Sequence, residues 1–256
     1  MTSVFEDAFD RADSGSDEDA GGLLPRPDAA SPASSASASA SAGDAGGADA
    51  GDGGLLAQEL KDAAAATVAS ESNSLGPNWR QVKTNAWRIE NGKLCGQGAH
   101  NHGVWLQKIL PINARIEFDA MSTSDDGDLK AEVWGDGQSG ATGVSYNNAT
   151  SYLAILGGWK NTLHVLARLN EHGQDRKEIK VDKESDDPRQ KPVVKSQVYR
   201  FKIERTDGKT IHFSVDGVEY HSFIDPQPLA GAGHDHFGFN EWEVKTCYDN
   251  VKVTPL

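Results

Sequence analysis

The stretch QVYRFKIERTDGKTIHFSVDGVEYHSF, residues 197–223, decides the fold class of this chain. Apolar and polar residues alternate through Gln197–Arg205, Thr210–Val215 and Val218–Phe223, as in strands that bury one face. The dipeptides Asp207–Gly208 and Asp216–Gly217 lie between these runs, and Asp-Gly favours a two-residue hairpin turn. The stretch therefore predicts three antiparallel strands joined by tight turns.

Similar short runs, separated by Gly, Asn, Asp and Pro, recur over the whole of residues 74–256. They are Ala114–Ala120, Asp128–Trp134, Ser151–Leu156, Thr162–Leu169, Glu178–Val181, His236–Asn240 and Tyr248–Val253. This part of the chain has no long helical pattern and no internal repeat. We therefore expect an all-β domain, an antiparallel β-sandwich of jelly-roll type.

Charge is distributed unevenly along the chain, which has a formal net charge of -13. Residues 1–73 hold 14 acidic and 3 basic side chains, whereas residues 74–256 are nearly balanced. This charge argues against nucleic-acid binding and against docking on an anionic membrane. No apolar run approaches the roughly 20 residues of a membrane-spanning helix, so we expect no membrane insertion. Met1–Asp7 lacks the basic and apolar regions of a signal peptide, either because there is none or because it has been removed.

Residues 14–73 consist mainly of Ala, Ser, Gly and Asp. Such a segment cannot bury enough apolar surface to offset the entropy of ordering, so we predict that it is disordered. Within it, residues 54–70 place Leu56, Leu60 and Ala63 at helical spacing. A short amphipathic helix is expected there, although such a helix would be marginal in isolation.

The beginning of the chain resembles that of a known superfamily. Phe5-Glu-Asp-Ala-Phe9-Asp-Arg11-Ala-Asp13-Ser-Gly15 is similar to the opening phrase of concanavalin A-like lectin/glucanase domains, the jelly-roll superfamily that includes laminin G-like domains. Leu75-Gly-Pro-Asn-Trp79 resembles the phrase that follows, Trp87–Leu94 a later one, and Tyr248–Val253 the closing strand. The resemblance implies that residues 4–13 supply the first strand, which pairs with the last.

In that interpretation, residues 14–73 are an insertion between the first strand and the rest of the domain, residues 74–256. A long insertion is tolerable because the cost of loop closure grows only with the logarithm of length. The alternative is a disordered tail over residues 1–73. The superfamily contains lectins, glycosidases, lyases, proteases and adhesion modules, so the resemblance implies a fold and no single function.

Laminarinase-type glycosidases of this superfamily carry the signature Glu-x-Asp-x-x-Glu on one strand, where it aligns the carboxylates for retaining hydrolysis. Glu117 and Asp119 are two residues apart, as are Glu241 and Glu243, but no third acid follows at the required spacing. We therefore assign no catalytic residue, and we leave other polysaccharide chemistry as an alternative.

The run Asp128–Trp134 suggests a binding surface. Alternation places two sets of side chains on opposite faces, with Leu129, Ala131 and Val133 toward the core and Asp128, Lys130, Glu132 and Trp134 outward. A charged row that ends in Trp suits a shallow sugar-binding trough, because rings pack on apolar sugar faces and carboxylates accept hydroxyl hydrogen bonds. The alternative is a solvated face with cross-strand ion pairs.

The run Thr162–Leu169 adds a second row, in which His164, Leu166 and Arg168 share a face. Arg168 is expected to pair with Glu132 or Asp128 if the two strands are neighbours, and Trp159 lies in the preceding turn. With residues expected at the rim, the candidate ligand-binding set is Asp128, Lys130, Glu132, Trp134, Trp159, Arg168, His102, Trp105, His236, Asn240 and Trp242.

Two His-x-His phrases, His100-Asn-His102 and His234-Asp-His236, suit a transition metal if they lie on strands. The glycines around them favour loops instead, and with them a polar rim. The resemblance also implies a structural calcium ion between the first and last strands, with Glu6 or Asp7 and Asp249 as carboxylate ligands. Alternatively, Asp249 forms only a turn hydrogen bond.

Cys95 and Cys247 are the two cysteines of the chain. A disulfide between them would close a loop of about 150 residues, provided that the two Cα atoms lie within about 7 Å. The sequence leaves open whether they pair. A disulfide would indicate an oxidising, extracytoplasmic compartment.

The sequence thus favours a non-catalytic carbohydrate-binding or adhesion module of the cell surface, with a glycan or another cell-surface partner. A polysaccharide-active hydrolase or lyase is one alternative. The other is a structural subunit of a surface assembly, in which the chain forms homo-oligomers.

Overall fold

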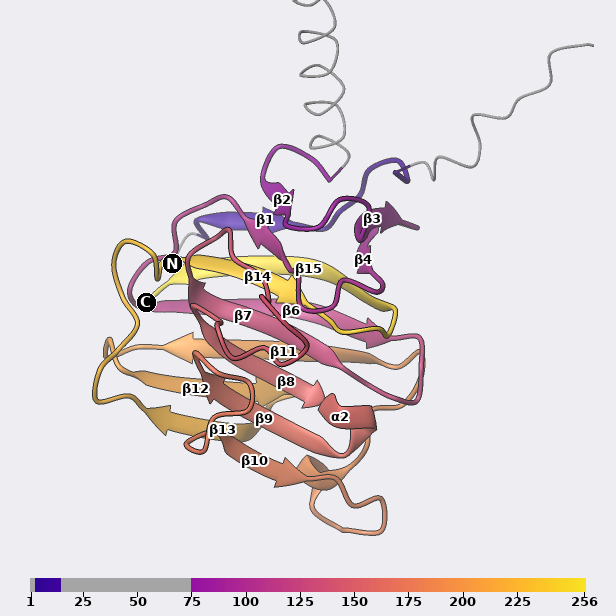
Figure 1. The fold of residues 1–256 in the computed structure, drawn as a ribbon, viewed down its shortest axis with the longest axis vertical. Helices are drawn as coiled ribbons and strands as arrows, with labels where there is room; N and C mark the ends of the chain where they lie inside the picture. Colours follow the sequence, from indigo (N-terminus) through magenta and orange to yellow (C-terminus); the bar gives the residue numbers. More distant parts are fainter. Residues whose placement is uncertain (1–2, 15–74) are drawn as a thin grey trace, which may run out of the picture. The chain divides into compact units, whose positions relative to one another are not determined.

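The computed structural model describes residues 3–14 and 75–256 of the chain. The expected disordered segment and its helix at 54–70 therefore lie outside the described residues, apart from Ser14. The described part consists of two antiparallel sheets packed face to face, with almost no helix (Figure 1). This architecture confirms the prediction of an all-β antiparallel sandwich.

The first sheet has eight strands. Its main path runs, in spatial order, through β13 (Val218–Ile224), β12 (Thr210–Val215), β11 (Val198–Arg205), β6 (Ala114–Ser122), β15 (Thr246–Pro255), β4 (Lys93–Gly96) and β3 (Trp87–Glu90). The three strands predicted from residues 197–223 form the β11–β12–β13 edge, joined by antiparallel pairing.

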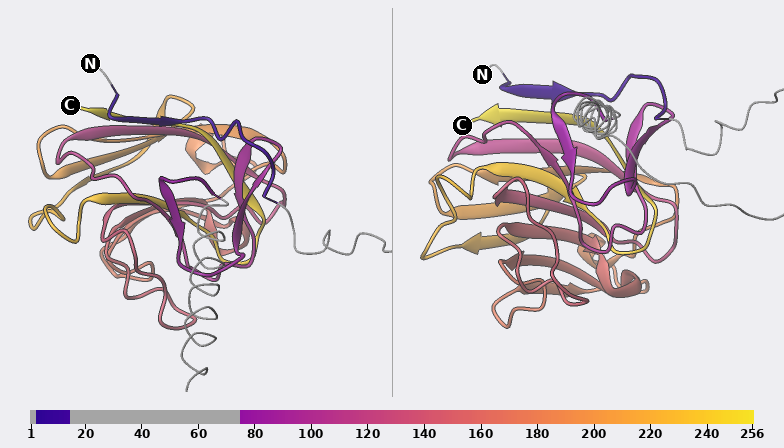
Figure 2. Two further views of the ribbon diagram at one scale, coloured as in Figure 1. Left: turned by 90° about the horizontal axis from the view of Figure 1, so that it is seen from above. Right: turned by 45° about the horizontal axis from the view of Figure 1, so that its top comes forward.

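The eighth strand, β1 (Phe5–Asp7), pairs with the last strand, β15, with Phe5 opposite Val253. This pairing is the one that the inserted-strand interpretation expects. Figure 2 shows β1 beside β15 in one layer, with β14 in the other layer.

The second sheet has seven strands. Their spatial order is β10 (Lys177–Lys180), β9 (Leu163–Arg168), β8 (Tyr152–Gly157), β7 (Leu129–Gly135), β14 (His236–Asn240), β5 (Val104–Leu106) and β2 (Trp79–Gln81). Two short helical turns, α2 (Gly158–Asn161) and η2 (Pro188–Gln190), lie in the connections.

The main core lies between the two sheets and follows the alternation of the strands. On β7, Leu129, Ala131 and Val133 are fully buried and belong to this core, as predicted. On the facing strand β6, burial alternates along its whole length, and Phe118 contacts Phe201, Phe237 and Phe239. Burial of these rings is the main favourable contribution to folding.

A second apolar cluster covers the opposite, outward face of the seven-stranded sheet. Residues 136–151, which connect β7 to β8 and which we call the roof loop, fold back over that face. The roof loop contributes Ala141, Tyr146 and Ala149, and the sheet contributes Leu153, Ile155, Val165 and Ala167. The outward face is therefore mostly covered.

The two cysteines lie directly opposite each other on neighbouring strands, Cys95 on β4 and Cys247 on β15. Their sulfur atoms are bonded, and their Cα atoms are 4.0 Å apart. The disulfide joins positions that are 152 residues apart in the sequence. Among the described residues, no helix has the length and apolar character needed to cross a membrane.

Candidate functional site

A cavity of about 840 Å³ opens at one end of the seven-stranded sheet, and we call it the end cavity. The segments around it are the start of β7, the roof loop, the turn α2, and the loops before β5, after β9 and after β14. Its walls carry three aromatic rings, four carboxylates, two amides and two lysines: Trp159, His172, Trp242, Asp126, Asp128, Glu171, Glu243, Gln97, Asn101, Lys160 and Lys245. Thr123, Ser124, Val144, Ser145 and Val244 complete it.

The inner wall of the end cavity is a buried ionic cluster. Lys130 is almost completely buried behind Asp128, and its Nζ donates to Glu171 Oε1 at 3.1 Å and to Asn101 Oδ1 at 2.7 Å. Burial opposes the charge on Lys130, but Glu171 and Asp128 outweigh it and raise the lysine pKa. Burial also raises the pKa of Asp128. The wall therefore presents fixed acceptors held around a buried cation.

The aromatic wall is positioned by an unusual turn. Trp159, Lys160 and Asn161 all have positive φ, between 51° and 61°, so they form a left-handed turn without glycine. Each such residue costs about 1 kcal/mol. The Asn161 side chain holds the turn, because its Nδ2 donates to the carbonyl oxygens of Asp125 and Val193 and its Oδ1 accepts from Val193 N.

Left-handed backbone recurs around the end cavity. Asn101 and Asp128 also have positive φ, so four of the residues that line it share this conformation. Gly127, next to Asp128, must be glycine because a Cβ there would lie 2.5 Å from the carbonyl oxygen of Gly157. Strained backbone of this kind concentrates at functional sites, where the surrounding structure holds it in place.

Glu241 lies fully buried beside Trp242. Its Oε1 accepts from the backbone N–H of Ala99, whereas its Oε2 has no hydrogen-bond partner among residues 3–14 and 75–256. Burial raises the pKa of Glu241 to about 7. The carboxyl joins the segment that carries Trp242 to the loop that carries Asn101, so it supports the rim of the end cavity.

Three of the eleven sequence-predicted ligand residues line the end cavity: Asp128, Trp159 and Trp242. Lys130 lies behind its wall. Glu132 and Asn240 are fully buried under the roof loop, where Glu132 accepts from Tyr146, Ser151 and Asn240. The expectation of an open polar trough along β7 is therefore wrong, because the roof loop covers that row.

Trp134 does not continue the outward row of β7. Its φ is positive, and the pairing of β7 with β14 shifts register between His236 and Phe237, so its ring turns into the main core. There it lies under the guanidinium of Arg205, 3.9 Å from ring centre to Cζ. A β-bulge thus overturned the alternation that predicted an exposed ring.

The other predicted residues are held elsewhere. Arg168 pairs with Asp225 at 2.7 Å and not with Glu132 or Asp128, because it faces the far end of β8, opposite Tyr152. Trp105 is fully buried and donates to Ser139 O of the roof loop. The rings of His102 and His236 contact the carbonyl oxygen of Ala99 and the Asp235 carboxylate.

The residues expected to bind calcium do not converge. Asp7 accepts from Arg11 and from the indole of Trp79, while Asp249 pairs with Lys93 on β4. Glu6 pairs with Lys252. No group of three or more His, Cys, Asp or Glu in the described ranges is arranged to hold a metal ion. These residues do not fit a calcium site. The expected calcium ion therefore has no support apart from the resemblance.

Sequence reasoning missed most of the polar wall, including Asn101, Glu171 and Lys160. Asn101 sits inside the first His-x-His phrase, and Glu171 follows the β9 run, so both had a local signal. No signal in the sequence indicated that they converge, because their convergence depends on how the loops fold back at the end of the sheet.

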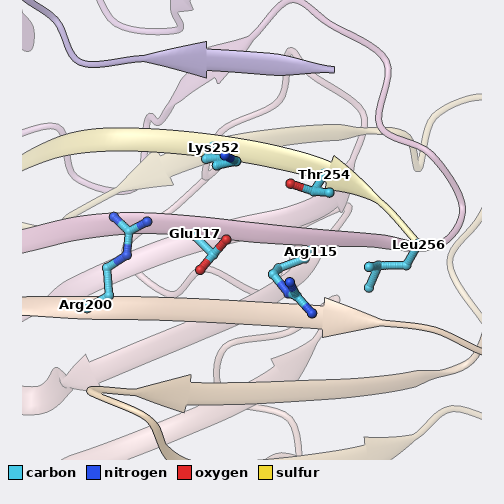
Figure 3. A pocket seen from close by; sticks show the side chains of 6 residues that line it. All are labelled: Arg115, Glu117, Arg200, Lys252, Thr254 and Leu256. Carbon is cyan, nitrogen blue, oxygen red and sulfur yellow. The ribbon is translucent and has the colours of Figure 1, made fainter. Parts of the chain in front are cut away.

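A second hollow, of about 530 Å³, lies on the outward face of the eight-stranded sheet. Figure 3 shows its lining on β6, β11 and β15 and at the residue that follows β15: Arg115, Glu117, Arg200, Lys252, Thr254 and Leu256. All three of its cations are engaged in ion pairs, with Glu204, Asp119 and Glu6. It has no aromatic ring, so we take the end cavity as the candidate site.

No protein-family model matches the chain, and no curated protein matches it. Solved structures do resemble it. A lichenase derived from a mouse hindgut metagenome is 10% identical, with a TM-score of 0.47, over 70% of this chain and 94% of that chain. The Bacillus licheniformis β-glucanase is 11% identical, with a TM-score of 0.46, over 70% and 92%.

Sheep galectin-11 is 12% identical, with a TM-score of 0.37, over 58% of this chain and 93% of that chain. At these identities and TM-scores, the likenesses indicate no activity for this chain.

Proposed function

We propose that the end cavity binds carbohydrate and that the protein is a non-catalytic glycan-binding module. The observation that carries this proposal is the pairing of two half-buried tryptophans, Trp159 and Trp242, with fixed acceptors on the wall behind them. Sugars need both: an apolar ring face stacks on an indole, and the hydroxyls donate to carboxylate and amide oxygens.

The acceptors are already in place without a ligand. Asn101 and Glu171 are held by Lys130, and Asp128 Oδ2 accepts from the backbone N–H of Trp242 at 2.8 Å. A preformed site loses less side-chain entropy on binding, which suits a weak, polar ligand such as a sugar. The strained turn that carries Trp159 supports the same function, because strained backbone concentrates at active and ligand-binding sites.

The disulfide supports a setting in an oxidising compartment. We therefore extend the proposal to a module that acts outside the cytoplasm, as a cell-surface or secreted protein.

A glycan array tests the proposal, with wild-type protein beside the Trp242→Ala and Ile224→Ala variants. Ile224 is an exposed apolar residue on β13, which belongs to the other sheet, and it does not line the end cavity, so it is the matched control. We expect wild type and Ile224→Ala to bind the same glycans and Trp242→Ala to lose at least about tenfold in affinity. Equal binding by Trp242→Ala would refute the end cavity as the site.

One observation favours a second candidate, a polysaccharide-active enzyme. Asp128 lies on the wall of the end cavity with a pKa raised by burial, as a general acid requires. Turnover of a polysaccharide panel that disappears in Asp128→Asn and persists in Asp126→Asn would favour this candidate. Absence of turnover together with retained binding would favour the module.

A further inference from the structure

We propose that the end cavity recognises the terminus of a glycan, or a free oligosaccharide of a few units, and not the interior of a polysaccharide laid across the sheet. This inference rests on the proposed carbohydrate binding and specifies its ligand class. It follows from the roof loop and the buried wall that close the cavity, and from the polarity and size of the cavity.

The roof loop removes the surface on which a long chain would lie. Trp105 on β5 is buried beneath it and donates to Ser139 O at 3.0 Å. On β7, Glu132 is closed off by Tyr146 and Ser151, with contacts of 3.0 and 2.6 Å. On β8 and β9 the apolar cluster of the roof loop occupies the same outward face. Along β7, the outward side chains Lys130 and Glu132 are therefore covered, and the end cavity lies beside Asp128.

The cavity is also closed on the side that faces the sheet. Lys130 follows Asp128 on the outward side of β7, is 1% exposed, and is tied to Asn101 and Glu171 from the two flanking loops. A further link is the hydrogen bond from Ala141 N of the roof loop to Asn101 O, at 2.8 Å. A sugar chain that enters past the tryptophans therefore meets this wall and cannot continue along β7.

The polarity of the cavity fits a chain end. The buried acceptors Asp128, Glu171 and Asn101 lie at the closed side, whereas Trp159 and Trp242 are partly exposed and the carboxylates of Asp126 and Glu243 are exposed. A terminal sugar carries a free hydroxyl where an interior sugar carries the next linkage. A site built to hydrogen-bond a hydroxyl strongly rejects a ligand that lacks it, because its buried polar groups are left unpaired.

The size agrees with a short ligand. The cavity of about 840 Å³ falls within the range of pockets that enclose small molecules. We expect a ligand of a few sugar units to fill it, and a longer chain to extend into solvent without new contacts.

The test is calorimetric titration of wild-type protein with oligosaccharides of one to six units. The probes are the β-1,3-glucose, β-1,4-glucose, β-1,4-mannose, β-1,4-xylose and β-1,4-N-acetylglucosamine series. We expect affinity in the binding series to rise to two or three units and then to change less than about twofold up to six. Affinity that keeps rising to six units would overturn the inference and leave the proposed function standing. No binding by any series would overturn the proposed function, and this inference with it.

Two further arms make the result specific. In the first, the binding oligosaccharide is reduced to its alditol at one end or blocked at the non-reducing end. We expect one of these changes to lower affinity at least about tenfold, and equal affinity for all three ligands would contradict recognition of a terminus. In the second, Trp242→Ala must lose the binding and Ile224→Ala must keep it. If Trp242→Ala binds like wild type, the measured binding lies outside the end cavity and the inference fails.

Discussion

Lys130 Nζ lies 3.1 Å from Glu171 Oε1 and 4.0 Å from Asp128 Oδ1, on the sheet side of the end cavity. All three side chains are buried. The contact joins β7 to the loop after β9. The shape of the end cavity therefore depends on the buried charge of Lys130. This relationship explains why a residue expected on an open face acts as an internal support.

Lys130→Met is expected to destabilise the fold by about 3–5 kcal/mol, because it leaves Asp128 and Glu171 as buried acids without their cation. The free energy of unfolding from urea titration measures this loss. The double variant Lys130→Met/Glu171→Gln should recover part of it, since one of the unpaired charges is removed. A single variant within about 1 kcal/mol of wild type, or no recovery in the double variant, would contradict a buried ion pair.

Glu132 gives a pH-dependent contribution to stability. Burial raises its pKa to about 7, although hydrogen bonds from Ser151, Asn240 and Tyr146 act to lower it. A carboxyl whose folded pKa exceeds its unfolded value stabilises the fold fully below the unfolded pKa of about 4.5, and this contribution is lost as pH rises through about 7. The loss is about 1.4 kcal/mol per pH unit within that window.

Two buried histidines oppose this trend in the wild-type protein. Burial lowers the pKa of His164 to about 4 and also lowers that of His221, so their contribution is lost as pH falls. The measurement is therefore a difference in unfolding free energy between wild type and Glu132→Gln. We expect the deficit of the variant to shrink steadily from pH 4.5 to 7. A constant difference across that range, like that expected of the exposed control Glu184→Gln, would show that Glu132 does not titrate there.

Trp134 and Trp242 should behave in opposite ways. Trp134→Ala empties a core site against Tyr152 and Arg205 and should cost about 3–5 kcal/mol in unfolding free energy. The protein that remains folded should bind glycan as wild type does. Trp242→Ala should lose binding at little cost in stability, because its ring is partly exposed. Thermal unfolding and titration of both variants give the comparison, and loss of binding in folded Trp134→Ala would contradict the placement of its ring.

Loss of the disulfide should lower stability without changing the site. Cys95→Ser/Cys247→Ser removes a cross-link between positions 152 residues apart, which typically costs about 2–5 kcal/mol. In the wild type, reductant should lower the free energy of unfolding measured in urea by the same amount as the double substitution does. A wild type that is insensitive to reductant, or that reacts with a thiol reagent before reduction, would contradict the bond.

Local pattern in the sequence was enough to predict most of the strands, although not β2 to β5, and most of the core face of β7. The Asp-Gly turns define the β11–β12–β13 edge, and the alternation on β7 places Leu129, Ala131 and Val133 inside. These features depend on neighbours in the chain, which is why they can be predicted without coordinates.

The outward face could not be predicted in the same way. Residues 136–151 have the composition of a surface loop, yet Tyr146 and Ala141 belong to one apolar cluster with side chains of β8 and β9. That docking converts the outward row of β7 from an open surface into a buried network. The bulge at Trp134 is also non-local, because it arises from the register of β7 against β14.

The most direct test of the account is the response of the six tryptophan indole N–H signals in a ¹H–¹⁵N spectrum during titration with a bound oligosaccharide. Four indoles are 2% exposed or less and donate to protein oxygens: Trp79, Trp87, Trp105 and Trp134. The account predicts that Trp159 and Trp242 shift while these four stay in place. Saturable binding that leaves both Trp159 and Trp242 unshifted would contradict it.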